Sequence, residues 1–354
     1  MNPSEEEGTL SKRKIIELLK TKNKEEVYRL YQIADKTRKK YMGDEIHLRG
    51  IIEFSNYCRR DCLYCGLRRS NARLHRYRMT FSEIFQTALK TQTLNFKTVV
   101  LQSGEDPAYR VEDLCLLIKK IKKELHLAIT LCIGERPRQE YEVMKEAGAD
   151  RFLLKHETSD YPLYKRLHPD LFYEDRLKCL SWLKELGYQV GSGNMVGLPG
   201  QSVESLAEDI LLFKKLDVDM VGIGPFIPHY DTPLRNTKTG SLDAVLKIIA
   251  IARIVTKNAH IPATTAVGTI DPLGRQKALQ CGANVIMPNI TPQKYRRDYQ
   301  IYPDKICIFE DAEDCHSCIQ GMVKSLGRTI ASSFGHSLKK RFKNLEEKDE
   351  KNIP

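Results

Sequence analysis

The chain has 354 residues, 41% of them hydrophobic, which is enough to bury a large core and excludes disorder over most of its length. No run approaches the roughly 18 consecutive apolar residues of a membrane helix, and the first ten residues are acidic and polar rather than a secretion signal, so we expect a cytoplasmic protein without membrane contact. The net charge of +11 is carried mostly by lysines on helical faces and in a mixed-charge tail, which indicates a solvated surface rather than a nucleic-acid partner.

Two charged helices are predicted before the first strand, over residues 10–20 and 24–41. Ser11 is a suitable N-cap for the first of them. Residues 1–45 are therefore expected to form a helical extension that covers the bottom or the side of the next domain.

From residue 46 to 327, short β-branched runs alternate with amphipathic helical segments, a pattern typical of repeated βα units and a parallel sheet. Three segments, KEAGADRFLL, KELGYQVGSG and LQCGANVIMP, place glycine just past a helix, where a left-handed cap is needed, and a strand follows at once. This rhythm favours an α/β fold of the (β/α)₈ TIM-barrel type over an open sheet. The predicted strands are 47–54, 97–102, 127–133, 151–156, 189–195, 220–225, 261–266 and 284–287, and the main predicted helices are 81–94, 111–125, 173–186, 203–216 and 242–257.

The chain continues after the eighth predicted strand into a cysteine-bearing segment, 303–320, that we assign to the barrel domain. A helix over 319–326 is predicted to serve as the eighth barrel helix. Residues 328–354 are charge-rich and are expected to form a mobile tail.

Ten cysteines in a chain expected in the cytosol indicate metal or redox chemistry rather than disulfides. Six of them fall into two clusters. The other four stand alone among apolar neighbours, which is typical of ordinary packing: Cys115, Cys132, Cys179 and Cys281.

The first cluster, in SNYCRRDCLYCGLR, directly follows the first predicted strand and gives Cys58, Cys62 and Cys65 a Cys-x₃-Cys-x₂-Cys spacing. Thiolates bind iron–sulfur clusters and zinc. A structural zinc site needs four ligands, and no fourth Cys or His lies nearby, so a zinc loop is the weaker alternative. Three ligands leave one iron of a [4Fe-4S] cluster open to a small molecule.

This array, with Tyr64 just before its third cysteine, resembles the radical S-adenosylmethionine (SAM) superfamily. The resemblance implies that SAM chelates the open iron and is cleaved reductively to methionine and a 5′-deoxyadenosyl radical, so no residue is expected to act as a catalytic acid or base. The position after a strand agrees with a barrel fold, because the active sites of TIM-type barrels lie on the loops at the carboxyl ends of the strands.

The resemblance also implies contacts to SAM from three further segments. In LQSGEDP, after the second strand, Ser103–Glu105 corresponds to a segment that contacts the SAM amino group. Lys155 and Glu157, two residues apart, can point to one side of a strand. Relatives often have Arg at the position of Lys155, and Lys cannot make the bidentate contact that Arg makes. Arg176 matches a contact to the SAM carboxylate, with a plain surface or an ion-paired Arg as the alternative. The predicted cofactor-binding residues are Tyr64, Gln102, Ser103, Glu105, Lys155, Glu157 and Arg176.

The predicted substrate cavity at the same end of the barrel is lined by hydroxyl, thioether and thiol groups rather than by an acid–base pair, which suits the guidance of a radical. Cys132 either adds a thiol to this cavity or merely packs. The predicted cavity residues are Cys132, Met195, Thr264, Thr265, Met287 and Tyr299.

The segments YCRRDCLYCGLRR, LQSGEDP, MVGLPGQ, GIGPFIPH, ATTAVGTI, GANVIMPN and YPDKICIFE together resemble the HydE family of radical SAM maturases of [FeFe]-hydrogenase, over about residues 46–327. The resemblance implies action on a small iron precursor that carries carbon monoxide, cyanide and cysteine. It also implies an electron donor and other hydrogenase maturation proteins as partners. The alternative is a methylornithine synthase-like mutase or synthase acting on an amino acid; a non-catalytic metal scaffold is disfavoured by the open cysteine array.

The second cysteine group, Cys307, Cys315 and Cys318, has the Cys-x₇-Cys-x₂-Cys arrangement of an accessory [2Fe-2S] or [4Fe-4S] cluster found in some members of that family, where it is dispensable. Zinc is the alternative. His316 is expected to be exposed to solvent rather than to complete this site.

Overall fold

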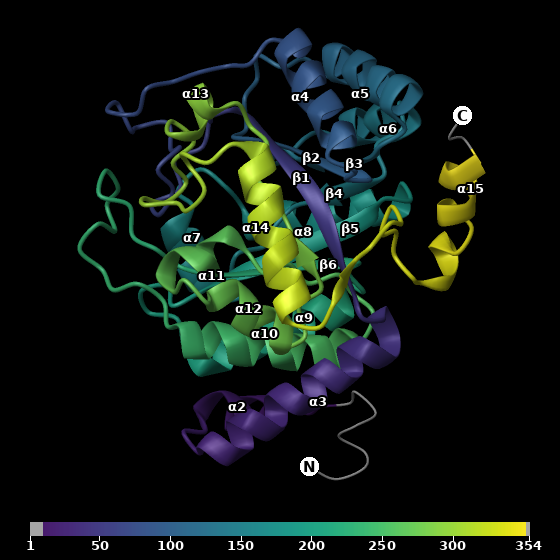
Figure 1. Cartoon of the computed structure of the whole chain (residues 1–354). Helices are drawn as coiled ribbons and strands as arrows, with labels where there is room; N and C mark the ends of the chain where they lie inside the picture. The colour runs from purple at the N-terminus through teal and green to yellow at the C-terminus, as the bar shows by residue number, and fades with distance from the viewer. Residues whose placement is uncertain (1–9, 352–354) are drawn as a thin grey trace.

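Parallel strands form the wall of a barrel in the computed structural model, which describes residues 10–351 (Figure 1). Strands pair in the order β6-β5-β4-β3-β2-β1-β7, and a short strand, β8, pairs with the first residues of β1. The register buries the wall: Ile52 of β1 lies opposite Leu101 of β2, and both are buried. The strands are β1 Glu45–Ser55, β2 Thr98–Ser103, β3 Ala128–Cys132, β4 Arg151–Leu153, β5 Gln189–Val196, β6 Met220–Pro225, β7 Val285–Ile286 and β8 Thr329–Ile330.

The ring between β6 and β7 is closed by isolated bridges, in which β6 pairs with His260 and Pro262 pairs with β7. The predicted fold class, a TIM-type α/β barrel with N-terminal helices and a cysteine-bearing C-terminal extension, is confirmed. The predicted seventh strand over 261–266 is wrong. Pro262 has no N–H to donate to a ladder, and helix α11 (Thr265–Ile270) begins where the strand was expected to continue.

Helices cover the outside of the barrel (Figure 1). The five main predicted helices are confirmed to within one residue at each end, because local signals define them: a capping box joins Thr80 and Glu83, and Gly148, Gly187 and Gly282 have positive φ after helices, as predicted. Among the described residues, no helix is long and apolar enough to cross a membrane. The helices that follow β1 are α4 Phe81–Thr93, α5 Val111–Leu125, α6 Arg138–Glu146, α7 Tyr161–Leu167, α8 Tyr173–Glu185, α9 Val203–Lys215, α10 Leu242–Thr256, α11, α12 Gly274–Gln280, α13 Gln293–Arg296 and α14 Ala312–Ser325.

The two predicted N-terminal helices are confirmed as α2 (Lys12–Lys20) and α3 (Lys24–Met42), and Ser11 caps α2 by accepting a hydrogen bond from the Lys14 N–H at 3.2 Å. They lie against the side of the barrel, where Lys20 pairs with Glu204 of α9 at 2.8 Å. The first nine residues of the predicted extension, and residues 352–354 of the predicted tail, lie outside the described residues.

The C-terminal region differs from its prediction in two respects. Helix α14 begins at Ala312, seven residues before the predicted helix, because Asp311 caps it by accepting from the Asp314 N–H. Residues 328–354 were expected to form a mobile tail, but Phe334, His336 and Ser337 are buried at the amino ends of the barrel strands, which we call the barrel base. Composition alone did not reveal these buried residues between charged ones. The tail continues as a 3-10 turn at Lys340–Phe342 and α15 (Leu345–Lys351).

Candidate active site

The predicted cysteine loop lies at the carboxyl ends of the strands, the barrel mouth, and begins three residues after β1. Backbone hydrogen bonds fix it on two sides: the Leu63 N–H donates to the Leu167 carbonyl at 2.9 Å, and the Gly66 N–H donates to the Ile301 carbonyl at 3.1 Å. Gly66 is required there, because a Cβ at that position would lie 1.9 Å from the carbonyl oxygen of Gln300. The loop is therefore held by segments from distant parts of the chain.

The three thiols of this loop are partly buried and close enough to influence one another. Burial and repulsion from the neighbouring thiols raise the pKa of Cys62, and burial with repulsion from Cys58 raises the pKa of Cys65 to about 12. Thiolates that destabilise one another are stabilised by a bound cation. The loop therefore has the donor chemistry of a metal centre.

The three loop thiols do not form a compact site for a single ion. Among residues 10–351, only Asp150, His336 and Asp349 form a group of three possible ligands whose donor atoms all lie within 4.8 Å of one another, so at least two of the loop sulfurs lie farther apart than this. A single zinc ion with Zn–S bonds of about 2.3 Å brings its sulfur ligands to about 3.8 Å from one another.

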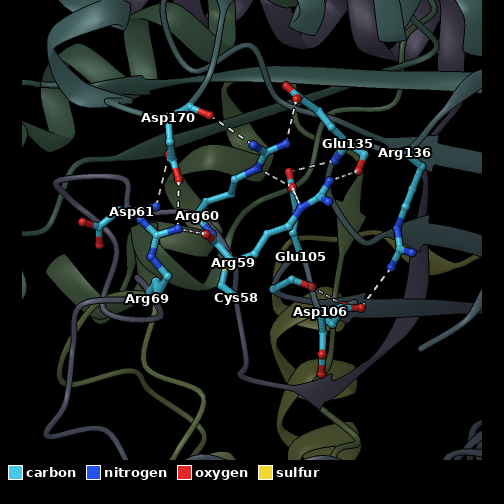
Figure 2. A network of polar contacts seen from close by, with 12 residues as sticks. Cys58, Arg59, Arg60, Asp61, Arg69, Glu105, Asp106, Glu135, Arg136 and Asp170 are labelled. Atoms are coloured by element: carbon cyan, nitrogen blue, oxygen red, sulfur yellow. Dashed lines mark hydrogen bonds and ion pairs between the residues drawn. The ribbon is translucent and has the colours of Figure 1, made fainter. Parts of the chain in front are cut away.

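A network of arginines and carboxylates backs the cysteine loop (Figure 2). Glu105, buried after β2, accepts from Arg60 at 2.5 Å, from Arg59 at 3.1 Å and from the Glu135 N–H at 2.9 Å. Glu105 was predicted to contact SAM, but its carboxylate accepts hydrogen bonds from these protein groups. Gly134 is required beside it, because a Cβ there, at φ +75°, would lie 2.0 Å from the Glu105 side chain.

Glu135 is a site residue that sequence reasoning missed. It joins Arg60, at 3.3 Å, to Arg176, whose Nε donates to Glu135 at 2.6 Å. Arg176 is buried, so it is not a plain surface arginine, and its pairing with Glu135 agrees with the alternative of an ion-paired Arg. A signal for Glu135 was available, since Gly-Glu follows both the second and the third strand, at Gly104–Glu105 and Gly134–Glu135.

Lys155 and Glu157 lie together at the barrel mouth, 3.2 Å apart, as predicted, although β4 ends at Leu153 and strand alternation is not the cause. Glu157 instead has a positive φ of 66°, and its N–H donates to the Gly193 carbonyl. Its Oε2 is the oxygen that lies 3.2 Å from Lys155 Nζ, and no other donor reaches it. A carboxylate oxygen with a single partner can accept further hydrogen bonds from the hydroxyl or ammonium groups of a ligand.

The remaining predicted cofactor residues border this pair. The Tyr64 hydroxyl lies 2.9 Å from His168 Nε2, and its ring packs edge-on against that imidazole. Gln102 is hydrogen-bonded to the buried Tyr299, and the Ser103 hydroxyl donates to the Gly104 carbonyl at 2.7 Å.

Five of the six predicted cavity residues are only partly buried, although the strands before them are buried. Burial raises the pKa of the Cys132 thiol to about 12, which keeps it neutral beside Lys155. Thr264 donates to the Ile223 carbonyl at 3.4 Å. Tyr299 differs from the others because it is fully enclosed. The partly exposed members are Cys132, Met195, Thr264, Thr265 and Met287.

A buried ion pair that sequence reasoning missed lies in the wall of the barrel mouth. Lys305 donates to Glu53 of β1 at 2.5 Å, and the Asn289 amide donates to the other Glu53 oxygen at 2.9 Å. Lys305 also lies 3.4 Å from the Tyr299 carbonyl. Glu53 and Lys305 are 252 residues apart, so no local pattern relates them.

The second cysteine group is partly assembled. The Cys307 and Cys315 thiols are hydrogen-bonded to each other, and Arg275 lies 3.8 Å from the Cys307 sulfur. The hydrogen bond and the Arg275 charge lower the pKa of Cys307 to about 6. Cys318 follows on the next turn of α14 and is exposed. His316, expected to be exposed, is half-buried, with its ring 5.1 Å from that of Phe96.

The sequence matches a family model described as the Radical SAM superfamily over residues 52–213, which include the three loop cysteines. The [FeFe] hydrogenase maturase subunit HydE of Thermotoga maritima is 55% identical over 306 residues, 86% of this chain and 88% of that protein. The 3-methylornithine synthase of Methanosarcina acetivorans is 34% identical over 76% of each chain.

Solved structures agree with the barrel. A crystal structure of methylornithine synthase (PylB) superposes with a TM-score of 0.80 at 29% identity, covering 93% of this chain and 96% of that one. A crystal structure of HydG, described as a maturase of the [FeFe]-hydrogenase, superposes with a TM-score of 0.78 at 18% identity, covering 96% of this chain and 77% of that one. At that identity, the second likeness concerns the fold alone.

Proposed function

The chain belongs to the HydE family of radical SAM enzymes, the maturases of [FeFe]-hydrogenase, and we propose that Cys58, Cys62 and Cys65 hold the [4Fe-4S] cluster with which this family cleaves SAM. The observation that carries the proposal is the group of three partly buried thiols at the barrel mouth, spread more widely than one zinc ion requires. These three cysteines would hold the cluster, which would supply the one electron needed for reductive cleavage of the sulfonium–C5′ bond of SAM to methionine and a 5′-deoxyadenosyl radical.

The chain's own residues bind and orient SAM in this proposal. Glu157 offers its carboxylate, whose Oε2 has Lys155 as its one partner at 3.2 Å, to the ribose hydroxyls or the amino group of SAM. Arg176 holds the Lys155 backbone through a hydrogen bond of 2.5 Å to its carbonyl. The other proposed contacts are Tyr64, Gln102 and Ser103, while Glu105 positions the arginines beside Cys58.

For the substrate we propose a small anionic iron complex that carries carbon monoxide, cyanide and cysteine. The wall of the barrel mouth holds the ammonium groups of Lys155 and Lys305, each paired with a glutamate, and the partly exposed Lys155 can donate charge-assisted hydrogen bonds to an anion. The neutral lining of Cys132, Met287 and Thr265 adds no exposed general base. Other hydrogenase maturation proteins are the proposed macromolecular partners, and the cytoplasm, where ten free cysteines are expected, is the proposed location.

The second candidate is an amino-acid mutase or synthase, which the 34% identity to 3-methylornithine synthase favours. The same barrel mouth offers Lys155 and Glu53 to an amino acid's carboxylate and ammonium groups. Turnover of lysine in place of the iron complex would identify this activity.

We further propose that Cys307, Cys315 and Cys318 hold an accessory [2Fe-2S] or [4Fe-4S] cluster. The paired thiols of Cys307 and Cys315, with Cys318 one turn later on α14, support this assignment. The segment 303–320 then belongs to the catalytic domain, 46–327.

The experiment is anaerobic reconstitution with iron and sulfide, followed by electron paramagnetic resonance of the reduced protein and detection of 5′-deoxyadenosine with dithionite as reductant. We expect a [4Fe-4S] signal that changes when SAM is added, and both signal and product lost in Cys62→Ala. Cys281→Ala, at a buried lone cysteine, is the matched control and should retain both. Product formation by Cys62→Ala at the wild-type rate would contradict the proposal.

A further inference from the structure

The cysteine loop carries an excess of arginine that the proposed function does not use. Between Cys58 and Arg78 the sequence contains seven arginines and one acidic residue, Asp61. Three of these arginines project into solvent, with side chains 49%, 62% and 84% exposed, and we call them the arginine rim: Arg59, Arg69 and Arg73.

Each rim arginine has a carboxylate partner that is the more buried member of the pair. Arg59 pairs with Glu105, which is 7% exposed, Arg69 with Asp170 at 27%, and Arg73 pairs at 3.0 Å with a carboxylate that is 11% exposed. The carboxylates therefore hold the arginines from below, and the guanidinium groups face outward. Because their orientation is already restrained, little side-chain freedom is lost when a partner binds them.

The rim lies next to the proposed cluster site. Arg59 follows Cys58 directly, the Arg60 N–H donates to the Cys58 sulfur at 3.5 Å, and Arg69 donates to the Arg59 carbonyl at 3.0 Å (Figure 2). A partner that contacts Arg59 is thus bound to the residue next to Cys58, and Arg69 lies against the same backbone. Electron transfer slows steeply with distance, so this face is suited to electron entry.

An exposed apolar side chain lies beside the rim. Phe172 is 70% exposed, two residues after Asp170, whose carbonyl accepts from Arg60 at 3.1 Å. An exposed aromatic residue among arginines is the composition that is enriched in protein–protein interfaces.

We propose that the arginine rim, with Phe172, is the docking surface for a small acidic one-electron carrier protein. The proposal rests on the proposed function, because each SAM cleavage consumes one electron that the chain itself does not supply. The carrier is oxidised by one electron, which passes through the Cys58 side of the site and is used in breaking the sulfonium–C5′ bond. Carboxylates of the carrier form charge-assisted hydrogen bonds with the guanidinium groups, and their charge accelerates encounter.

The test measures binding directly, with oxidised flavodoxin as the acidic probe and the reconstituted full chain, by calorimetry at low and at high salt. For the double variant Arg69→Gln/Arg73→Gln we expect Kd to rise by about tenfold and the salt dependence to weaken. Lys119→Gln/Lys123→Gln removes the same charge from the outer face of α5 and should change Kd by less than about twofold.

A kinetic arm separates this inference from the proposed function. The rim variant should form 5′-deoxyadenosine as the wild type does with dithionite, and more slowly with reduced flavodoxin. No product with dithionite in the wild type refutes the proposed function instead. The docking proposal is overturned if the wild type does not bind flavodoxin, if the rim variant binds it unchanged, or if the lysine variant loses as much affinity.

Discussion

The two ends of the barrel both contain buried charged side chains, but the partners of those side chains differ. At the barrel base, Arg151 is fully buried and donates to the Phe334 carbonyl at 2.8 Å, to Thr98 and to Gln189, while Arg49 donates to the Gly335 carbonyl at 3.1 Å. The C-terminal segment thus supplies backbone acceptors that close the base.

At the barrel mouth the charged side chains are paired with each other, since Lys155 lies 3.2 Å from Glu157 and Lys305 lies 2.5 Å from Glu53. At the base, by contrast, Arg49 Nε is buried without a hydrogen-bond partner. The Lys155 side chain is partly exposed, whereas Arg151 at the base is not. The contrast teaches that the base arginines are enclosed by acceptors of the protein itself, whereas the Lys155–Glu157 pair at the mouth remains partly open to solvent.

The largest effect is expected from Arg151→Ala at the base. The substitution leaves a cavity and unsatisfied acceptors, so the free energy of unfolding should fall by about 3–5 kcal/mol. Urea unfolding measures it, and Arg13→Ala, at an exposed arginine, is the control and should change stability by less than about 0.5 kcal/mol. Equal stability of Arg151→Ala and wild type would remove the distinction between the two ends.

Gly335→Ala tests how tightly the C-terminal segment fits the base. Gly335 has a φ of +63°, and a Cβ there would lie 2.6 Å from the His47 ring, so strain and clash should together cost about 2–3 kcal/mol. Gly327→Ala separates the two effects, because Gly327 has a φ of +66° but nothing within 4 Å of its Cβ position. It should cost only about 1 kcal/mol, and thermal unfolding of both variants measures the difference.

Low pH should destabilise the barrel base through His47. Burial and the charges of Arg49 and Arg151 lower its pKa to about 3 in the folded protein, while the unfolded chain keeps a value near 6.5. The unfolded state therefore binds more protons between these values, so the stability contribution is complete above about pH 6.5 and is lost as pH falls towards 3, by up to about 1.4 kcal/mol per pH unit. His47→Gln should flatten this part of a urea-midpoint profile, and an unchanged profile would contradict the assignment.

The smallest effect on stability is expected at the mouth. Glu157→Gln removes the carboxylate that pairs with the partly exposed Lys155 at 3.2 Å, so the free energy of unfolding should fall by no more than about 1 kcal/mol. Affinity for SAM should fall by about tenfold, the loss expected for one charged hydrogen bond. Equilibrium dialysis with labelled SAM measures it. A loss of stability without a loss of affinity would show that the mouth is built like the base.

The sequence by itself determined the features that depend on neighbouring residues. Local signals located most helices and the repeated βα units of the barrel. These signals are apolar periodicity, the capping box at Thr80 and Glu83, and the glycine caps at Gly148 and Gly187. The spacing of Cys58, Cys62 and Cys65 predicted the proposed cluster loop, because three ligands of one cluster can come from one short segment.

Only the tertiary structure decided which distant residues meet. Glu53 and Lys305 pair across 252 residues, and Arg176 reaches Glu135 from another βα unit. The tail from Phe334 to Ser337 enters the base because its carbonyls satisfy two buried arginines. Such pairs leave no periodic trace in the chain, since barrel closure rather than local sequence brings the partners within hydrogen-bonding distance.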